Sequence, residues 1–113
     1  MLTIYHNPRC SKSRETLSLI KENSTKTLNI VKYLKDPIDQ ATIEKLLALL
    51  ACSPIEMMRV KEAEFKEQNL MGADDKTLIA AMVATPKLIE RPIVTDGKSA
   101  VIGRPPQNAL ALC

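Results

Sequence analysis

The segment "LTIYHNPRCSKSR", residues 2–14, contains the transition that decides the fold. Apolar and partly polar residues alternate over 2–5, which predicts a short half-buried strand that ends at the following Asn-Pro pair. Proline and glycine are absent from 11–23, where the spacing of apolar residues predicts a helix. Cys10 is therefore expected between the end of a strand and the N-terminus of a helix.

Residues 28–34 also alternate and are rich in branched side chains, which predicts a second strand. A strand, a helix and a strand in succession favour a parallel crossover pair. The next part, approximately residues 38–88, has helical periodicity and is expected to form an all-helical insert of about three helices. The first of its helices is predicted from the spacing of Ile43, Leu46, Leu47 and Leu50. The second is predicted to begin at a capping box of Ser53 and Glu56 and to include Met57, Met58 and Arg59. The third is predicted from Asp74 to Thr85.

The C-terminal part of the chain returns to strand-like alternation. The pair Asp96-Gly97 lies between two apolar arms and predicts a hairpin. Two prolines shortly after Gly103 favour the start of a short last helix. The predicted order of elements is β-α-β, helical insert and β-β-α. We therefore expect one α/β domain over residues 1–113.

Composition and charge argue against several classes of protein. Sixteen Lys and Arg stand against thirteen Asp and Glu, the two signs alternate, and only three residues are aromatic, so no nucleic-acid surface is expected. No run reaches the roughly 18 apolar residues of a membrane span, and the N-terminus lacks the pattern of a signal peptide. We expect a cytoplasmic monomer with no membrane contact and no bound metal or cofactor.

The three cysteines are expected to be free thiols. Their wide spacing fits neither a disulfide framework nor a zinc site. Ser13 occupies the position at which a dithiol oxidoreductase would have its second cysteine, so Cys10 has no local resolving thiol. Cys52 ends an apolar helix and Cys113 is the last residue. Packing and a frayed tail explain these two, although a long-range resolving role stays open for either.

The residues around Cys10 favour a reactive thiolate. A helix N-terminus, the charges of Arg9, Lys12 and Arg14, and nearby serine hydroxyls each favour the thiolate over the thiol, whose ordinary pKa is roughly 8.5. The alternative is a small buried apolar residue beside a solvated basic helix face. Because Cys10 lacks apolar neighbours and lies at a strand-to-helix junction, where open α/β sheets bind ligands, we favour the reactive thiol.

His6, the only histidine, and three isolated arginines complete the candidate site. His6 fits an ordinary surface or core position, or, when protonated, a charge that stabilises the thiolate. Arg59, Arg91 and Arg104 are far apart in sequence, and the last two precede prolines, whose stiff backbone fixes the direction of a guanidinium. Isolated arginines are mostly solvated, but guanidinium groups bind tetrahedral oxyanions bidentately. A thiolate beside several arginines suggests a reaction between sulfur and an anionic oxyacid.

Three motifs together carry a family resemblance: "YHNPRCSKSRETL", "VKYLKDP" and "RPIVTDGKSAVIGRPP". In these motifs the chain resembles the glutaredoxin-coupled arsenate reductase (ArsC/Spx-like) family. The resemblance covers nearly the whole chain and implies a thioredoxin-like fold with a helical insert. It implies that Cys10 attacks arsenate and that the oxyanion is held by Arg59, Arg91 and Arg104. It further implies that His6 lowers the pKa of the thiol, that Ser13 and Arg14 support the thiolate, and that Pro92 follows a cis peptide bond.

The loop after the cysteine differs from that of established arsenate reductases of this type. They have Cys-Gly-Thr-Ser-Arg, whereas this chain has Cys-Ser-Lys-Ser-Arg, which loses the conformational freedom of glycine and gains a cation. In this loop the chain looks more like the YfgD-type branch. The resemblance implies glutathione as co-substrate and glutaredoxin as partner. Lys12, as a cation beside the cysteine, is a candidate glutathione contact.

Three functions are consistent with these residues. In the leading one, Cys10 forms an adduct with arsenate, glutathione forms a mixed adduct, and glutaredoxin releases arsenite and restores the thiol. The second is a glutathione-dependent thiol oxidoreductase that acts on another substrate. The third is a non-enzymatic regulator that resembles the Spx proteins, which bind RNA polymerase. Those proteins typically use Cys-x-x-Cys as a redox switch, which Ser13 removes, so this function ranks last.

Overall fold

A computed structural model describes residues 1–113, which divide into two compact units. The first unit comprises residues 1–36 and 91–113, and the second comprises residues 37–90. The first unit contains, in chain order, β1 (Leu2–Tyr5), α1 (Ser11–Asn23), β2 (Leu28–Val31), β3 (Ile93–Thr95), β4 (Ala100–Ile102) and the 3-10 helix η3 (Pro106–Leu112). None of the helices combines the length and the apolar composition needed to cross a membrane.

The four strands of the first unit form one sheet in the order β2-β1-β3-β4. β1 pairs in parallel with β2, and it pairs antiparallel with β3, which in turn pairs antiparallel with β4. The predicted crossover pair and the predicted hairpin are therefore both confirmed. β2 is shorter than predicted and ends at Val31, because the Lys32 carbonyl accepts hydrogen bonds from the N–H groups of Lys35 and Asp36 and forms a turn.

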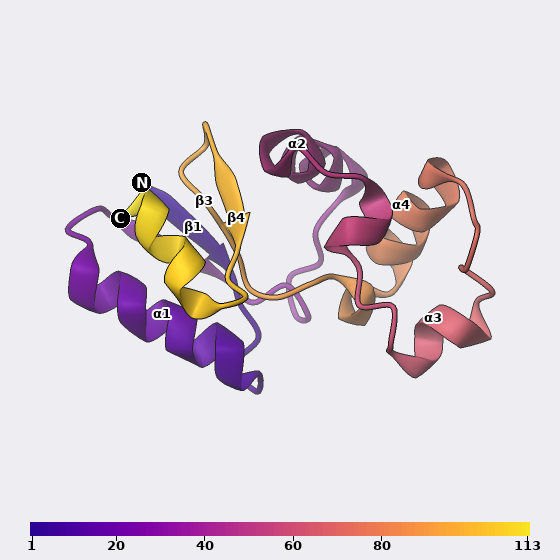
Figure 1. The fold of residues 1–113 in the computed structure, drawn as a ribbon, viewed down its shortest axis with the longest axis horizontal. Coiled ribbons are helices and arrows are strands. Elements are labelled where there is room, and N and C mark those ends of the chain that lie inside the picture. The colour runs from indigo at the N-terminus through magenta and orange to yellow at the C-terminus, as the bar shows by residue number, and fades with distance from the viewer. The chain divides into compact units, whose positions relative to one another are not determined.

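The core of the first unit lies between the sheet and two helices. Figure 1 shows α1 and η3 side by side against the same face of the sheet. The buried cluster between them consists of Leu2, Ile4, Ile20, Val94, Ala109 and Leu112. This packing fixes the C-terminal end of β1 and the N-terminal end of α1, and Cys10 lies in the connection between them.

Gly103 lies where α1 packs against the chain that follows β4. A Cβ atom on Gly103 would lie 2.7 Å from Thr16 Oγ1 and 2.8 Å from Pro92 Cγ. Both side chains are short and stiff, so neither can move far enough to relieve the clash. We expect Gly103→Ala to lower the free energy of unfolding by roughly 1–3 kcal/mol through overpacking, as measured by urea denaturation. Adding Thr16→Ala removes part of the clash and should recover part of the loss. An unchanged free energy in the single variant would contradict this close packing.

The second unit is helical apart from one isolated bridge. Its elements are α2 (Gln40–Leu50), the 3-10 helix η1 (Pro54–Met57), α3 (Ala63–Glu67), α4 (Asp75–Ala84) and the 3-10 helix η2 (Pro86–Leu88). α2 and α4 begin where predicted because the carboxylates of Asp39 and Asp74 accept hydrogen bonds from the N–H groups of Thr42 and Thr77. α3 was not predicted from the sequence.

The helix predicted after Ser53 is wrong in its type and its end. The Glu56 carboxylate accepts hydrogen bonds from both the N–H and the hydroxyl of Ser53, as a capping pair should, but the result is the short 3-10 helix η1. Met58 instead forms a bridge with Ile89, and the Arg59 N–H donates to the Leu88 carbonyl at 2.7 Å. Pairing of Met58 with Ile89, which is 31 residues away in sequence, therefore overrides the local helical signal.

Candidate active site

A tight turn places Cys10 at the N-terminus of α1. The Cys10 N–H donates to the Asn7 carbonyl at 3.0 Å, and the Arg9 N–H donates to Asn7 Oδ1 at 3.0 Å. The Cys10 carbonyl then accepts the Arg14 N–H at 3.0 Å, the first hydrogen bond of the helix. Cys10 is thus the N-cap residue, and its half-buried side chain lies at the positive end of the helix dipole, as predicted.

Two arginines from the C-terminal segment lie at the sulfur of Cys10. Arg104 Nη2 donates to Cys10 Sγ at 3.4 Å, while Arg104 Nε donates to the Arg91 carbonyl at 2.8 Å. The Arg91 guanidinium also interacts with the sulfur, and its buried Nε has no hydrogen-bond partner. Both arginines precede cis-prolines, the Arg91-Pro92 bond as the resemblance implied and the Arg104-Pro105 bond in addition.

The surroundings of Cys10 lower the pKa of its thiol. Burial raises this pKa, but the Ser13 backbone N–H, the Arg91 side chain and the Arg104 charge together lower it by more, so it lies below the ordinary value. The sulfur forms no full capping hydrogen bond, although the Ser13 N–H faces it. No acidic residue occupies the first turn of α1 to offset these positive groups. The site therefore favours the thiolate.

His6 and Ser13 form a buried polar pair. His6 Nδ1 and Ser13 Oγ share a hydrogen bond of 2.6 Å, and the Asn7 N–H donates to the same oxygen at 3.1 Å. Burial, and then the charges of Lys32, Lys21 and Arg14, lower the pKa of His6, so the neutral imidazole is favoured at pH 7. The structure therefore argues against the protonated His6 considered from the sequence. Instead, His6 holds Ser13, whose N–H faces the sulfur.

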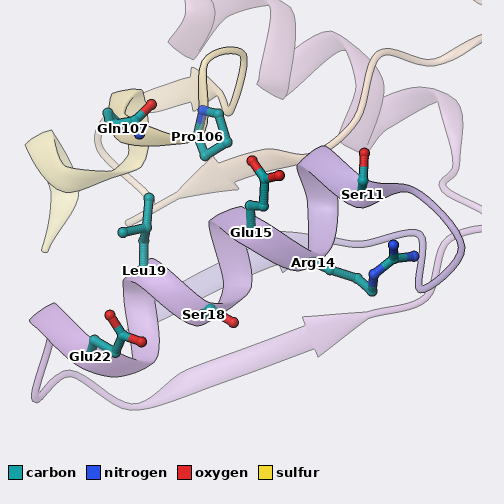
Figure 2. A pocket seen from close by; sticks show the side chains of 8 residues that line it. All are labelled: Ser11, Arg14, Glu15, Ser18, Leu19, Glu22, Pro106 and Gln107. Atoms are coloured by element: carbon teal, nitrogen blue, oxygen red, sulfur yellow. The ribbon is translucent and has the colours of Figure 1, made fainter.

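Two further basic residues near Cys10, Arg14 and Lys12, contact neighbouring groups. Arg14 Nη1 donates to the Pro8 carbonyl at 3.0 Å, and Figure 2 shows its side chain directed toward the loop before α1. Lys12 Nζ lies 3.8 Å from the Glu15 carboxylate, an exposed pair one helical turn apart. Arg14 therefore stabilises the turn that contains Cys10, and the charge of Lys12 is partly balanced by the Glu15 carboxylate.

A groove of about 420 Å³ runs along α1 beside η3. Figure 2 shows that α1 contributes most of its lining, with Pro106 and Gln107 of η3 on the other side. The groove begins at Ser11, next to the cysteine, and continues past Glu15 to Glu22. Its lining contains two carboxylates, of Glu15 and Glu22, and one cation, Arg14, so its charge does not favour an anionic substrate.

Arg59 belongs to the second unit, and its proposed place beside Cys10 stays a prediction. Its Nε donates to Glu62 Oε1 at 3.0 Å, and Lys87 Nζ lies 3.5 Å from the same carboxylate group. These contacts hold the Nε end of the guanidinium within its own unit. No group of three or more His, Cys, Asp or Glu residues is arranged to hold a metal ion.

All three cysteines are free, but Cys52 and Cys113 differ from Cys10 in their surroundings. Burial, and then the Glu56 carboxylate, raise the pKa of Cys52. Cys113 packs against the core of the first unit, and its thiol donates to the Ala109 carbonyl at 3.5 Å. Neither thiol has a cation at hydrogen-bonding distance. The partial burial of Cys52 agrees with the packing role inferred from the sequence, whereas the contacts of Cys113 argue against the frayed tail expected there.

Residues 5–112 match the sequence model of the ArsC family. The chain belongs to the ArsC family. YfgD of Escherichia coli (strain K12) is 52% identical over 112 residues, which cover 96% of this chain and 93% of that protein. An arsenate reductase of Neisseria meningitidis serogroup A is 40% identical and covers 98% of this chain and 97% of its own length. The solved structure of the arsenate reductase from Vibrio cholerae is 43% identical, has a TM-score of 0.92 and covers 99% of this chain and 97% of its own.

Membership of the ArsC family confirms the predicted thioredoxin-like α/β fold. It also confirms the resemblance drawn from the three motifs, including the similarity to YfgD. One residue of this site was missed in the sequence. Asn7 builds the turn with its carbonyl and its side-chain oxygen, and the Asn-Pro dipeptide, interpreted only as the end of a strand, was the available signal.

In this ArsC-family chain we expect Cys10 to be alkylated by iodoacetamide with a midpoint pH below the free-cysteine value of roughly 8.5. Cys52, whose pKa is raised, is an internal control and should react with a higher midpoint in the same samples. Because the folded state binds the Cys10 proton less tightly than the unfolded chain, the free energy of unfolding should rise as the pH rises between the two pKa values. A Cys10 midpoint at or above that of Cys52 would contradict the arrangement.

Proposed function

We propose that this ArsC-family protein reduces arsenate to arsenite through a covalent adduct on Cys10. The observation that carries the proposal is a thiol of lowered pKa with the guanidinium groups of Arg91 and Arg104 at its sulfur. A thiolate is the reactive form of cysteine, and guanidinium groups bind tetrahedral oxyanions. Relatives that align over nearly the whole chain are named arsenate reductase, which supports the same substrate here.

The two arginines orient the oxyanion for attack. Arg91 Nε is a buried donor without a partner, which costs roughly 1–3 kcal/mol until a ligand accepts its hydrogen bond. An arsenate oxygen supplies that acceptor, and the terminal nitrogens of Arg104 bind a second oxygen. The Cys10 thiolate then forms a sulfur–arsenic bond, and one arsenate oxygen leaves as water after protonation. Arg59 would be the third ligand of the oxyanion, and His6 would act by positioning Ser13.

The electrons for the reduction come from outside the chain. Ser13 cannot form a disulfide, the pKa of Cys52 is raised, and the Cys113 thiol donates a hydrogen bond to a backbone carbonyl. Glutathione joins the adduct, and glutaredoxin then releases arsenite and restores Cys10. In sum, one thiol of glutathione and one of glutaredoxin become a mixed disulfide, arsenate gains two electrons, and water is released.

An arsenite-production assay tests this function. The full chain is incubated with arsenate, glutathione and glutaredoxin, and each component is omitted in turn. We expect arsenite only when all are present, and competition by phosphate, which has the same charge and shape. If no arsenite forms but the protein reduces a small mixed disulfide with glutathione, the thiol oxidoreductase considered above replaces this function.

A further inference from the structure

A second cavity, of about 430 Å³, lies at the C-terminal ends of β1 and β2. Its volume is within the range of roughly 300–1,000 Å³ that small-molecule sites occupy. Asn7 and Arg9 line one part, and Lys32, Leu34 and Lys35 line the other. All lining residues belong to the first unit, so that unit alone forms the cavity.

The charge of this cavity is entirely positive. Arg9, Lys32 and Lys35 line it, no acidic residue does, and none of the three side chains forms an ion pair or a hydrogen bond. Lys12 and Lys87, in contrast, each have a carboxylate partner. Like charges gathered around one cavity repel one another, and an anion removes that cost. The cavity is therefore suited to a ligand with more than one carboxylate.

The cavity is close enough to Cys10 to serve a ligand whose sulfur reacts there. The hydrogen bond from the Cys10 N–H to the Asn7 carbonyl closes a four-residue turn, and Asn7 and Arg9 of this turn line the cavity. The Cα atoms of Asn7 and Cys10, the first and last residues of such a turn, lie within about 7 Å of each other. A tripeptide can extend over roughly 10 Å. The groove along α1, whose lining side chains Figure 2 shows, begins at Ser11, the residue after Cys10, but Glu15 and Glu22 would repel carboxylates there.

We propose that this cavity binds the carboxylates of glutathione through Lys32, Lys35 and Arg9, and so places the glutathione sulfur at Cys10. The proposal rests on the use of glutathione in the proposed function, and it assigns the contact to these residues in place of Lys12. Leu34, which is 47% exposed, gives the methylene groups of the peptide an apolar surface.

The test uses disulfide exchange, which needs no arsenate. The Cys10 thiolate attacks one sulfur of oxidised glutathione, a Cys10–glutathione disulfide forms, and the second glutathione leaves as a thiolate, with no net oxidation. The same reaction is run with bis(2-hydroxyethyl) disulfide, which has no charge. The rate of adduct formation on the Cys10 peptide is followed by mass spectrometry for both reagents, and the ratio of the two rates cancels any change in the pKa of Cys10.

We expect the double variant Lys32→Gln/Lys35→Gln to lower this ratio about three- to tenfold, since two exposed ion pairs are lost, and added salt to lower the ratio of the parent protein. The matched control is Lys45→Gln/Lys76→Gln, which removes the same charge from exposed positions of α2 and α4 and should leave the ratio unchanged. Equal ratios in the two double variants would overturn the proposal. A lower ratio in Lys12→Gln alone would return the contact to Lys12 and also overturn it.

Direct binding separates this proposal from the proposed function, because it does not depend on a reactive thiol. Titration with S-methylglutathione, followed by NMR, should shift the amide signals of Asn7 and of residues 32–35 in the parent protein and not in the Lys32→Gln/Lys35→Gln variant. Inorganic phosphate is titrated in parallel. Equal affinity for phosphate at the same amides would show a general anion site and overturn the assignment to glutathione. Binding of S-methylglutathione without any arsenite production would leave this site standing while the arsenate function fails.

Discussion

Replacing Cys10 by serine should abolish arsenite production, because the hydroxyl of serine is neither ionised nor nucleophilic enough near pH 7 to attack arsenate. The loss is expected to be complete within the detection limit of an assay with arsenate, glutathione and glutaredoxin. The thiol is half-buried and accepts a long hydrogen bond from Arg104, which a serine oxygen can also accept, so serine should be accommodated and the circular dichroism spectrum should not change.

The matched control is the double variant Cys52→Ser/Cys113→Ser, which should keep most of the activity. Neither thiol has cations at its sulfur, and the pKa of Cys52 is raised, so neither is suited to resolve an adduct on Cys10. Turnover of this variant should still require glutathione with glutaredoxin and should be poorly supported by thioredoxin. A folded but inactive double variant, or multiple turnovers with thioredoxin alone, would indicate an internal disulfide relay.

The local pattern around Cys10 was predictable because its determinants lie within a few residues of one another. The strand, the Asn-Pro turn and the proline-free helix each depend on short-range backbone preferences, and the structure has β1, the turn and α1 at the predicted positions. The placement of Arg91 and Arg104 at the sulfur is a longer-range result. It could be proposed only because both precede prolines and both belong to a motif that resembled a family.

The features that could not be predicted depend on parts of the chain that are distant in sequence. Met58 is extended because it pairs with Ile89, and no local signal near Ser53 contains that partner. The neutral form of His6 follows first from burial and then from the charge of Lys32, 26 residues away, which only the folded sheet brings near. The cationic cavity was missed for the same reason, since Arg9 and Lys35 meet only when β1 and β2 pair.

The second large effect is expected for Arg104→Gln, which should lower kcat/KM for arsenate by roughly 10²–10³-fold, as the loss of one donor to a reacting oxyanion does in other enzymes. Arg104 donates to the sulfur and to the Arg91 carbonyl, so it lowers the pKa of the thiol and is fixed against the backbone of Arg91, the other proposed oxyanion ligand. Arg104→Lys keeps the charge but cannot form the bidentate hydrogen bonds of a guanidinium, so it should recover only a small part of the arsenate reduction that Arg104→Gln loses.

The pH dependence of Arg104→Gln separates the two roles of this arginine. If it acted only by lowering the pKa of Cys10, raising the pH to about 9, above the ordinary pKa of a cysteine, would restore the thiolate and with it the parent rate. We expect instead that iodoacetamide, which is neutral and needs no oxyanion site, reacts with Cys10 of the variant at the parent rate near pH 9, while arsenate reduction stays at least about tenfold lower. Full recovery of arsenate reduction at that pH would show that Arg104 tunes the thiol and does not bind the oxyanion.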